Sequence, residues 1–430
     1  MIIQASRIIP MIGPIIEDGA VRVEAETITY IGTALELIPE PGETVLDLGR
    51  AVLCPGFVNA HCHLDYTCFR GSIARSNSFT EWIKSINALK RQFTPEDFLE
   101  SINDGARMLL RSGTTSVANI AAFPELLSRL PEQPLRVWWF MEMMDVRSRL
   151  NNDDALFGAL SFFDQRPGRL SKYGLSPHAP YTASIELYRL AKRCSMETGM
   201  LFTTHIAESI EEHEMFVHAR GPLYEFLEKL GRENSDCGHG SPLSHLIEHG
   251  VLTSACLAVH LNYLEDYDMD ALAQSGASVI HCPKCHTYFG HNRFPMKDLR
   301  TLGINICLGT DSLASNNSLD MRSEIREARN LNPGISDHDW MAMATLNGAL
   351  ALGEAGHLGQ LSAGALADMA AYAWDGAMNP YATVIESKKE PLMVMVNGDI
   401  MAGTHSQVLP LIVPPSPAPV ESRETDAARP

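Results

Sequence analysis

Long apolar runs are missing from this chain of 430 residues. No stretch approaches the roughly 20 uninterrupted apolar residues that a membrane-spanning helix needs, so we expect no membrane segment. The first residues, Met1-Ile2-Ile3-Gln4-Ala5-Ser6-Arg7, also lack the charged start and apolar core of a secretory signal peptide. Both absences predict a cytoplasmic protein.

Basic residues are scarce relative to acidic ones. The chain holds 34 Lys and Arg against 52 Asp and Glu, which gives a formal net charge of -18. This balance argues against nucleic acid or an anionic membrane as the main partner, because both surfaces repel an acidic protein. We therefore expect a small-molecule partner, with no nucleic-acid partner and no membrane partner.

Cysteines are few and odd in number, nine in the whole chain. Several lie in apolar, strand-like segments (Cys54, Cys256, Cys307), which is typical of reduced core cysteine and not of a disulfide framework. An apolar fraction of 45% indicates a substantial core. The length suffices for one large barrel domain with an appendage, or for two or three ordinary domains.

Short apolar or β-branched runs alternate with helix-like stretches through the middle of the chain. This alternation predicts parallel strands joined by helices, and eight such strands predict an α/β fold with a (β/α)8 TIM-like barrel. The predicted strands are 51–60, 114–120, 135–141, 172–178, 201–206, 256–261, 277–281 and 304–310. The helix-like stretches include 79–92, 96–112, 184–199, 209–230 and 319–330.

Both flanks of this region contain short alternating strands broken by Gly and Pro turns, such as those at 20–24 and 394–400. Neither flank has enough strands for a stable sheet alone. We therefore expect residues 1–54 and 358–412 to form one small β-sandwich domain, and residues 55–357 to form the barrel. The tail, 413–430, is rich in Pro and small residues and is predicted to be disordered.

The motif His61-Cys62-His63 lies at the end of the first predicted barrel strand. Side chains two apart in a strand point to the same face, so these two imidazoles are placed to grip one metal ion. Taken alone, the motif is explained equally well by a chance pair of strand histidines. The other strand ends change that balance, because active sites of such barrels gather there. Candidate ligands or acid–base groups at these ends are His178, His205, Glu208, His260, His281 and Asp311.

Together these motifs resemble the amidohydrolase superfamily, and within it the aminohydrolase branch with one metal ion. The resemblance covers residues 1–405 and implies a metal-dependent hydrolytic deaminase. Relatives with two metals place a bridging lysine at the end of the fourth strand, where this chain has His178. The matching segments are Pro55-Gly56-Phe57-Val58-Asn59-Ala60-His61-Cys62-His63, Pro177-His178-Ala179-Pro180-Tyr181, His205-Ile206-Ala207-Glu208, Gly309-Thr310-Asp311-Ser312-Leu313-Ala314-Ser315-Asn316-Asn317 and Gly364-Ala365-Leu366-Ala367-Asp368-Met369.

The resemblance also implies a ligand set. The metal ligands by this resemblance are His61, His63, His205 and Asp311. Three imidazoles and one carboxylate suit one Zn²⁺ per subunit with a position left for water, and Fe²⁺ is the alternative. A metal ion lowers the pKa of its bound water towards neutrality, and Asp311 would take the proton.

Further roles follow from the same resemblance. Glu208 would protonate the ring nitrogen of the substrate, and the alternative is an acid that stabilises a helix N-terminus. His260 would orient the attacking hydroxide or stabilise the tetrahedral intermediate, and His178 would contact the substrate; a structural hydrogen bond is the alternative for both. Trp82 suits a flat heterocycle, although packing explains it as well. The remaining predicted substrate-binding residues are His281, Cys285 and Ser315.

Cys282-Pro283-Lys284-Cys285-His286 matches the C-x-x-C-H string of haem attachment. Haem attachment normally requires export, for which we see no signal peptide, and a structural zinc knuckle would need a second C-x-x-C pair. The segment directly follows the predicted strand 277–281. We therefore interpret it as an active-site loop that shapes the choice of substrate.

The predicted reaction converts a ring C–NH2 of a purine or adenosine derivative to C=O and releases ammonia. The pattern of residues 281–291 is similar to that of aminodeoxyfutalosine deaminases, whose substrate carries a carboxylate that Lys284 or Arg293 could bind. Alternative substrates are S-adenosylhomocysteine, methylthioadenosine, guanine and a chloro- or amino-substituted triazine. A homo-oligomer is a family expectation. Proteins of a different class that remain as alternatives are a non-catalytic amidohydrolase-like scaffold and a cytochrome-like redox protein.

Overall fold

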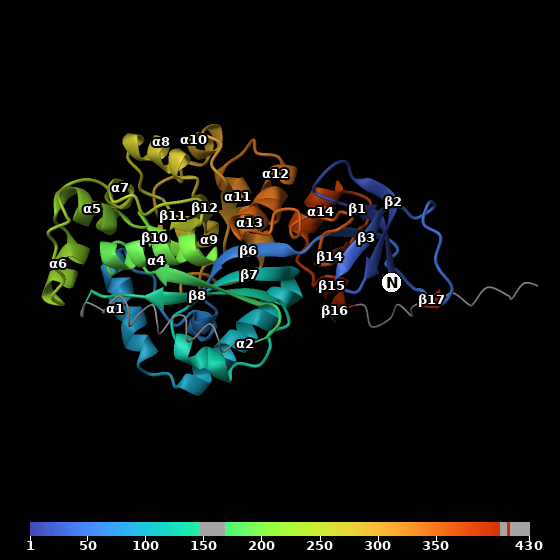
Figure 1. Ribbon diagram of the computed structural model, residues 1–430, viewed down its shortest axis with the longest axis horizontal. Coiled ribbons are helices and arrows are strands. Elements are labelled where there is room, and N and C mark those ends of the chain that lie inside the picture. The colour runs from blue at the N-terminus through green and yellow to red at the C-terminus, as the bar shows by residue number, and fades with distance from the viewer. Residues whose placement is uncertain (147–167, 405–410, 413–430) are drawn as a thin grey trace, which may run out of the picture.

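The computed structural model describes residues 1–146, 168–404 and 411–412. Eight parallel strands form a barrel, and a nine-stranded mixed sheet built from both ends of the chain lies beside it (Figure 1). No helix in these ranges is long and apolar enough to cross a membrane. The predicted α/β class, a TIM-like barrel with a small β domain from both chain ends, is confirmed.

The barrel strands follow one another in chain order, and each is parallel to its neighbours. A parallel bridge between Cys62 and Asp311 joins the segment after the last strand to the end of the first. The barrel is therefore closed between its first and last strands at the end that carries the predicted ligands. The strands are β6 (Phe57–Cys62), β7 (Thr114–Ala121), β8 (Arg136–Met143), β9 (Ser171–Pro177), β10 (Leu201–Ile206), β11 (Cys256–His260), β12 (Ser278–His281) and β13 (Ile306–Leu308).

Gly309 permits the close approach of the first and last barrel strands. An ideal Cβ at this position would lie 2.8 Å from the Cβ of His61 and 2.9 Å from its carbonyl oxygen. The amides of Thr310 and Asp311 both donate to that carbonyl at 3.1 Å. One backbone group of β6 thus fixes the segment that carries Asp311.

Helices surround the barrel, and their starts carry capping residues. The hydroxyls of Ser78 and Thr94 accept amides of the first turns of α1 and α2. The predicted helix 209–230 is two helices, because Ala219 and Gly221 have positive φ and Pro222 begins the second. The helical elements are η1 (Leu64–Phe69), α1 (Phe79–Lys90), α2 (Pro95–Ser112), η2 (Pro124–Arg129), α4 (Ile185–Thr198), α5 (Ile210–His218), α6 (Pro222–Lys229), α7 (Pro242–Glu248), α8 (Asp266–Ser275), α9 (Pro283–Phe289), α10 (Met296–Thr301), α11 (Met321–Leu331), α12 (Asp337–Met343), α13 (Leu346–Ala351) and α14 (Pro380–Glu386).

The small domain is one mixed sheet in the order β16-β15-β14-β5-β1-β2-β3, with β4 paired to β1 and β17 paired to β4. The antiparallel pair of β5 and β14 joins the two ends of the chain. Figure 1 shows the blue N-terminal strands beside the red C-terminal ones. The predicted tail, 413–430, lies outside the described residues. The strands are β1 (Ile2–Ile8), β2 (Ile16–Glu24), β3 (Thr27–Thr33), β4 (Thr44–Asp47), β5 (Ala51–Pro55), β14 (Met369–Ala373), β15 (Met393–Val396), β16 (Asp399–Ala402) and β17 (Leu411–Ile412).

The prediction of a single barrel strand over 51–60 is wrong, because this stretch is divided between two sheets. Strand β5 pairs with β1 and β14 of the small domain, and β6 pairs with β7 of the barrel. The change falls at Gly56, where an ideal Cβ would lie 2.2 Å from side-chain atoms of Thr115. Both strands are buried along their whole length, so the hydrophobic run gave no sign of the break.

Polar contacts join the two sheets. Arg136 at the start of β8 donates from Nε to Asp368 Oδ2 at 2.9 Å, and from an Nη atom to Asn397 Oδ1 at 2.6 Å. The Tyr372 hydroxyl on β14 donates to the carbonyl oxygen of Ser112 at the end of α2, at 2.9 Å. These contacts tie the small domain to the N-terminal ends of the barrel strands, away from the predicted site. The domain limits themselves stay a prediction.

Candidate active site

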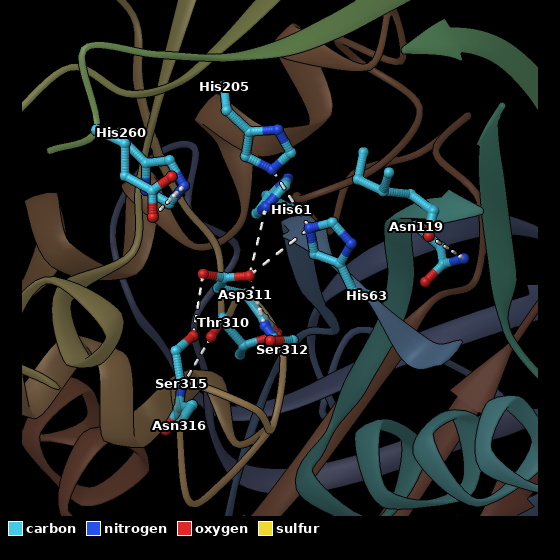
Figure 2. A network of polar contacts seen from close by, with 12 residues as sticks. His61, His63, Asn119, His205, His260, Thr310, Asp311, Ser312, Ser315 and Asn316 are labelled. Atoms are coloured by element: carbon cyan, nitrogen blue, oxygen red, sulfur yellow. Dashed lines mark hydrogen bonds and ion pairs between the residues drawn. The ribbon is translucent and has the colours of Figure 1, made fainter. Parts of the chain in front are cut away.

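Four barrel strands bring polar side chains into one buried cluster (Figure 2). His61 lies in β6 and His63 directly after it, while His205 lies in β10. His260 ends β11, and Asp311 follows β13. All five side chains are buried. The structure thus brings the four predicted metal ligands together with His260.

The donor atoms of the four predicted ligands face one another. His63 Nε2 and His205 Nε2 are 3.3 Å apart. Asp311 Oδ1 is 3.7 Å from His61 Nε2 and 3.7 Å from His63 Nε2. Ligands that each lie about 2.0–2.2 Å from one tetrahedral Zn²⁺ are about 3.3–3.6 Å from each other. The spacing of this cluster therefore fits one zinc ion.

The imidazoles have the protonation and hydrogen bonding that metal ligands need. Burial lowers the pKa of His63 well below its usual range and that of His205 to about 3, so both rings are neutral at pH 7. His205 Nδ1 lies 2.8 Å from the carbonyl oxygen of His178, and an N–H there leaves the lone pair on Nε2. Among the described residues, neither ring nitrogen of His61 and not Nδ1 of His63 has a hydrogen-bond partner. Buried nitrogens are normally satisfied, and metal ligation would satisfy His61 Nε2, the nitrogen of that ring that faces Asp311.

Asp311 supplies the negative charge of the cluster. The amide of Ser312 donates to its Oδ1 at 2.6 Å, and the Ser315 hydroxyl donates to its Oδ2 at 3.2 Å. Burial alone would raise the pKa of Asp311, but the neighbouring imidazoles of His61, His63 and His260 hold it well below its usual range. Asp311 is therefore a carboxylate that can both bind a cation and accept a proton.

The backbone around the cluster is strained at three strand ends. Ala207, His260, Leu261 and Asp311 have positive φ values of 51°, 77°, 53° and 55°. Non-glycine residues adopt this region rarely and at a cost of about 1–3 kcal/mol each. Backbone hydrogen bonds hold the strained turns, such as the one from the Leu261 amide to the Ile206 carbonyl at 2.9 Å. Strain of this kind is typical of functional sites.

Glu208 faces His260 beside the cluster. Its Oε1 lies 3.6 Å from His260 Nε2. Burial, and then the charges of Asp311 and Glu212, raise the pKa of Glu208 well above its usual value. The Glu208 amide donates to Glu212 Oε2 at 2.8 Å, and Asn262 Nδ2 donates to the Glu208 carbonyl at 2.9 Å, so its backbone is fixed. A carboxyl that keeps its proton near neutral pH can act as a general acid.

The alternative interpretation of Glu208, an acid that stabilises a helix N-terminus, has little support. The N-terminus of α5 is capped by Ser209, whose hydroxyl accepts the Glu212 amide. Glu212 itself accepts the amides of Ala207 and Glu208. The carboxyl of Glu208 is left facing His260 and the ligand cluster.

The sequence profile of the amidohydrolase family matches residues 52–401. The chain belongs to the amidohydrolase family. A 5-methylthioadenosine/S-adenosylhomocysteine deaminase of Pyrococcus abyssi is 30% identical to it over 348 residues, 77% of this chain and 76% of the relative. The aminodeoxyfutalosine deaminase of Deinococcus radiodurans is 28% identical over 350 residues, 78% of this chain and 81% of the relative.

Solved structures share the fold of this amidohydrolase. An adenosine deaminase of Xanthomonas campestris with bound zinc superposes with a TM-score of 0.81 at 24% identity, covering 93% of this chain and 92% of the other. An aminofutalosine deaminase of Helicobacter pylori in complex with methylthio-coformycin also gives 0.81, at 22% identity, covering 93% and 99%. The predicted enzyme class, an amidohydrolase-family hydrolytic deaminase, is confirmed.

Of the predicted substrate-binding residues of this amidohydrolase, His178 and Cys285 lie near side chains of the cluster. Trp82 lies on α1 and packs against α9. The His178 ring is 5.0 Å from the His205 ring, centroid to centroid. Cys285 Sγ lies within 4.8 Å of a donor atom of both Glu208 and His260. The ring of Trp82 on α1 packs edge-on against Phe289 of α9, at 5.1 Å. Trp82 thus fits the packing alternative as well as the substrate-binding one.

The two other predicted substrate-binding residues have other neighbours. His281 turns its ring onto Phe294, with the centroids stacked 3.9 Å apart. It belongs to none of the groups of close metal-ligating atoms in the described part of the chain. The Ser315 hydroxyl donates a hydrogen bond to Asp311 Oδ2. The geometry therefore favours supporting roles for both.

The C-x-x-C-H segment starts helix α9. Burial raises the pKa values of Cys282 and Cys285 well above the usual thiol value, so both remain thiols. Within the described residues, Cys282 and His286 join no group of three close metal-ligating side chains, whereas Cys285 groups with Glu208 and His260. The segment therefore lies beside the candidate active site, as predicted, but the prediction of a loop is wrong, because Pro283–Phe289 is a helix that begins directly after the Cys282 N-cap.

Asn59 and Glu212, two side chains that hold the site together, were not predicted from the sequence. Asn59 Nδ2 donates to Thr310 Oγ1 at 2.8 Å, and the Thr310 amide donates back to Asn59 Oδ1 at 3.1 Å. Asn59 lies two residues before His61, so the strand period alone could have placed it on the same face. Glu212 carried no such signal, because an acid in the first turn of a helix is common on a protein surface.

The serine beside Asp311 gives a testable prediction. We expect Ser315→Ala to weaken zinc binding by about 10- to 100-fold, because outer hydrogen bonds orient ligand carboxylates. Competition with a chelator of known affinity measures this loss. A higher KM with unchanged zinc affinity would instead show that Ser315 contacts the substrate.

Proposed function

We propose that this amidohydrolase is a one-zinc deaminase that replaces the amino group of an adenosine derivative with oxygen. The observation that carries the proposal is the placement of the buried Glu208 carboxyl 3.6 Å from His260 Nε2, since His260 in turn groups with His61 and Asp311 of the proposed ligands. Similarity to deaminases that act on adenosine derivatives supports the same substrate class.

The proposed metal ligands are His61, His63, His205 and Asp311, with one ion per chain. Their chemistry fits Zn²⁺, because three imidazoles and one carboxylate are borderline and hard donors in tetrahedral spacing. A zinc ion bound there would act as a Lewis acid that brings the pKa of a water molecule close to neutrality. Fe²⁺ accepts the same donors and is the alternative.

The protein side chains manage the protons of the reaction. Asp311 is ionised, so a carboxylate oxygen can accept one proton from the attacking water. Burial raises the pKa of Glu208 and so favours its protonated form, which would donate a proton to the ring nitrogen next to the amino-bearing carbon. His260 is neutral, because burial lowers its pKa well below the usual value, and it can hydrogen-bond the incoming oxygen.

The proposed steps balance as a hydrolysis. The water oxygen forms a bond to the ring carbon that carries the amino group. The exocyclic bond between this carbon and the amino nitrogen then breaks. The two water protons end on the ring nitrogen and on the departing amino group, which leaves as ammonia. The carboxyls of Glu208 and Asp311 return to their starting protonation states, and the ring carbon becomes C=O.

Aminodeoxyfutalosine is the proposed first substrate to test. The sequence pattern of residues 281–291 and the similarity to an aminodeoxyfutalosine deaminase both support it. Methylthioadenosine and S-adenosylhomocysteine are the next substrates to test, because the chain is also similar to deaminases of these two compounds. Guanine and a triazine complete the panel.

The test is ammonia release from this panel by purified, zinc-loaded protein. We expect turnover of at least one adenosine derivative and slower or no turnover of guanine and the triazine. Ammonia from the triazine alone would contradict the proposed substrate class. No ammonia from any compound, with zinc bound, would favour the non-catalytic scaffold.

We further propose a cytoplasmic homo-oligomer that takes a small heterocyclic substrate and binds neither nucleic acid nor membranes. The net charge of -18 supports the absence of a nucleic-acid partner. Light scattering coupled to size-exclusion chromatography would measure the number of chains in the assembly.

A further inference from the structure

His286 is the last residue of the C-x-x-C-H string, and its side chain is buried. Helix α9 places its ring Nδ1 3.0 Å from the side-chain Oδ1 of Asn262. Asn262 is buried too and lies two residues after His260, the last residue of β11. This contact therefore joins the segment after β12 to the segment after β11.

Asn262 in turn holds the main chain at Glu208. Its Nδ2 donates to the carbonyl oxygen of Glu208 at 2.9 Å, and its own amide donates to the carbonyl oxygen of Ala207 at 3.0 Å. One residue thus binds two successive carbonyl groups after β10. The Glu208 amide is bound from the other side by Glu212 Oε2 at 2.8 Å. Both main-chain polar groups of Glu208 are therefore fixed.

The chemistry of these groups sets the direction of each hydrogen bond. A carbonyl oxygen only accepts, so Asn262 must turn its NH2 group towards Glu208. The Oδ1 of Asn262, which also only accepts, then faces His286, so Nδ1 of that ring must carry a hydrogen. Burial lowers the pKa of His286 to about 4, so the ring is neutral at pH 7 and its one hydrogen lies on Nδ1. Without this donor, Asn262 Oδ1 would be buried and unpaired, at a cost that favours rotation of the amide away from Glu208.

The turns that these hydrogen bonds hold are strained. Ala207 after β10 has a φ of 51°, and His260 and Leu261 at the end of β11 have φ values of 77° and 53°. Such conformations of non-glycine residues persist only where the surrounding structure holds them. The two strand ends lie side by side, and the Glu208 and His260 side chains that extend from them are 3.6 Å apart, from Oε1 to Nε2. A change at Asn262 would therefore move the acid relative to His260.

We propose that His286 is a positioning residue, which orients the side-chain amide of Asn262 and thereby holds Glu208 where its carboxyl can transfer a proton. This inference rests on the proposed deaminase function and adds a residue that acts on the reaction through Asn262. A misplacement of about 1 Å can lower a rate by about 10²-fold, so a hydrogen bond remote from the carboxyl can control turnover. None of the four proposed zinc ligands takes part in these hydrogen bonds, so zinc binding should be retained.

Two substitutions of His286 differ in where they place an N–H group. The side-chain nitrogen of Asn lies close to the place of histidine Nδ1, and that of Gln lies close to the place of Nε2. We expect His286→Asn to keep kcat within about threefold of the wild type and His286→Gln to lower it by about 10- to 100-fold, with KM changed less than about threefold in both. Ammonia release measures both constants, and metal analysis should show one zinc per chain. Thr287→Val is the control on the same helix, because the exposed Thr287 hydroxyl donates to Glu327 Oε1 at 2.7 Å.

A double variant shows whether His286 acts through the general acid. Glu208→Gln has already lost proton transfer from this residue, so adding His286→Gln should lower kcat by less than about twofold more. A loss of the same factor in the wild-type and Glu208→Gln backgrounds would overturn the inference, because His286 would then act independently of Glu208. Equal losses in His286→Asn and His286→Gln would overturn it as well, since the position of the donor would not matter.

A variant of the bridging residue keeps the test independent of how well His286→Gln folds. Asn262→Leu removes the bridge and should lower kcat at least as far as His286→Gln does. Wild-type kcat in Asn262→Leu, together with the expected loss in Glu208→Gln, would overturn the inference and leave the proposed function standing. No ammonia from any adenosine derivative with zinc-loaded wild-type protein would overturn the proposed function and this inference with it.

Discussion

Glu208→Gln is expected to lower kcat by about 10²–10⁴-fold, the usual contribution of a positioned general acid. The amide is nearly the same size as the carboxyl but holds no proton that it can transfer to a ring nitrogen. The fold should tolerate the change, because the backbone at 208 is held by Glu212 and Asn262 and not by its own side chain. Steady-state ammonia release measures the loss.

Zinc content distinguishes an acid from a ligand in this experiment. Glu208 Oε1 faces His260 and is not among the four predicted ligands, so Glu208→Gln should keep one zinc per chain. Glu214→Gln is the matched control, because Glu214 lies on α5, the helix that follows Glu208, and its carboxylate accepts a hydrogen bond from Arg220 Nε at 2.6 Å. Loss of zinc in Glu208→Gln, or activity within a few-fold of the wild type, would contradict the assigned role.

The raised pKa of Glu208 also sets the expected pH dependence. A general acid works only while protonated, and burial keeps the proton on this carboxyl to a pH well above the usual value. Activity should therefore persist through neutral pH and fall as the pH rises through the pKa of Glu208. A profile of kcat/KM that rises steadily across neutral and alkaline pH would show that the essential group acts as a base.

His205→Ala is expected to abolish zinc binding and to lower activity by at least about 10³-fold. The ring lies 3.3 Å from His63 Nε2, and the His178 carbonyl orients it, so its loss removes a preset donor from the centre of the cluster. A metal ion typically supplies several kcal/mol of transition-state stabilisation, which corresponds to this fall in rate. Metal analysis and ammonia release on the same preparation measure both effects.

An exposed histidine provides the control for the ligand variant. The side chain of His357 is 64% exposed and lies near Glu354, outside the cluster. His357→Gln should keep full zinc content and activity. If His205→Ala kept one zinc per chain and wild-type turnover, the four-ligand site would be wrong.

Local patterns in the sequence predicted the barrel and the candidate groups at its strand ends, whereas the choice of four metal ligands among these groups came from the resemblance to the amidohydrolase superfamily. The spacing of His61 and His63 follows the two-residue period of a strand. The positions of His205 and Asp311 follow the rule that the functional groups of a parallel barrel lie at the ends of its strands. Neither inference required knowledge of which side chains touch.

The remaining features depend on three-dimensional contacts that no local pattern carries. The division of residues 51–60 between two sheets follows from the packing of Gly56 against Thr115. His281 lies at the expected strand end, yet its ring stacks on Phe294, which is distant from it in the sequence. The sequence shows His286 as the end of a C-x-x-C-H string, and its contact with Asn262 appears only in the fold.

Zinc titration of metal-free protein tests the central claim most directly. Protein stripped with a chelator would receive zinc in steps, and ammonia release from the preferred adenosine derivative would be followed at each step. The account predicts no activity without metal, a linear rise, and a plateau at one zinc per chain. Full activity in the stripped protein, or a plateau at two zinc ions per chain, would contradict it.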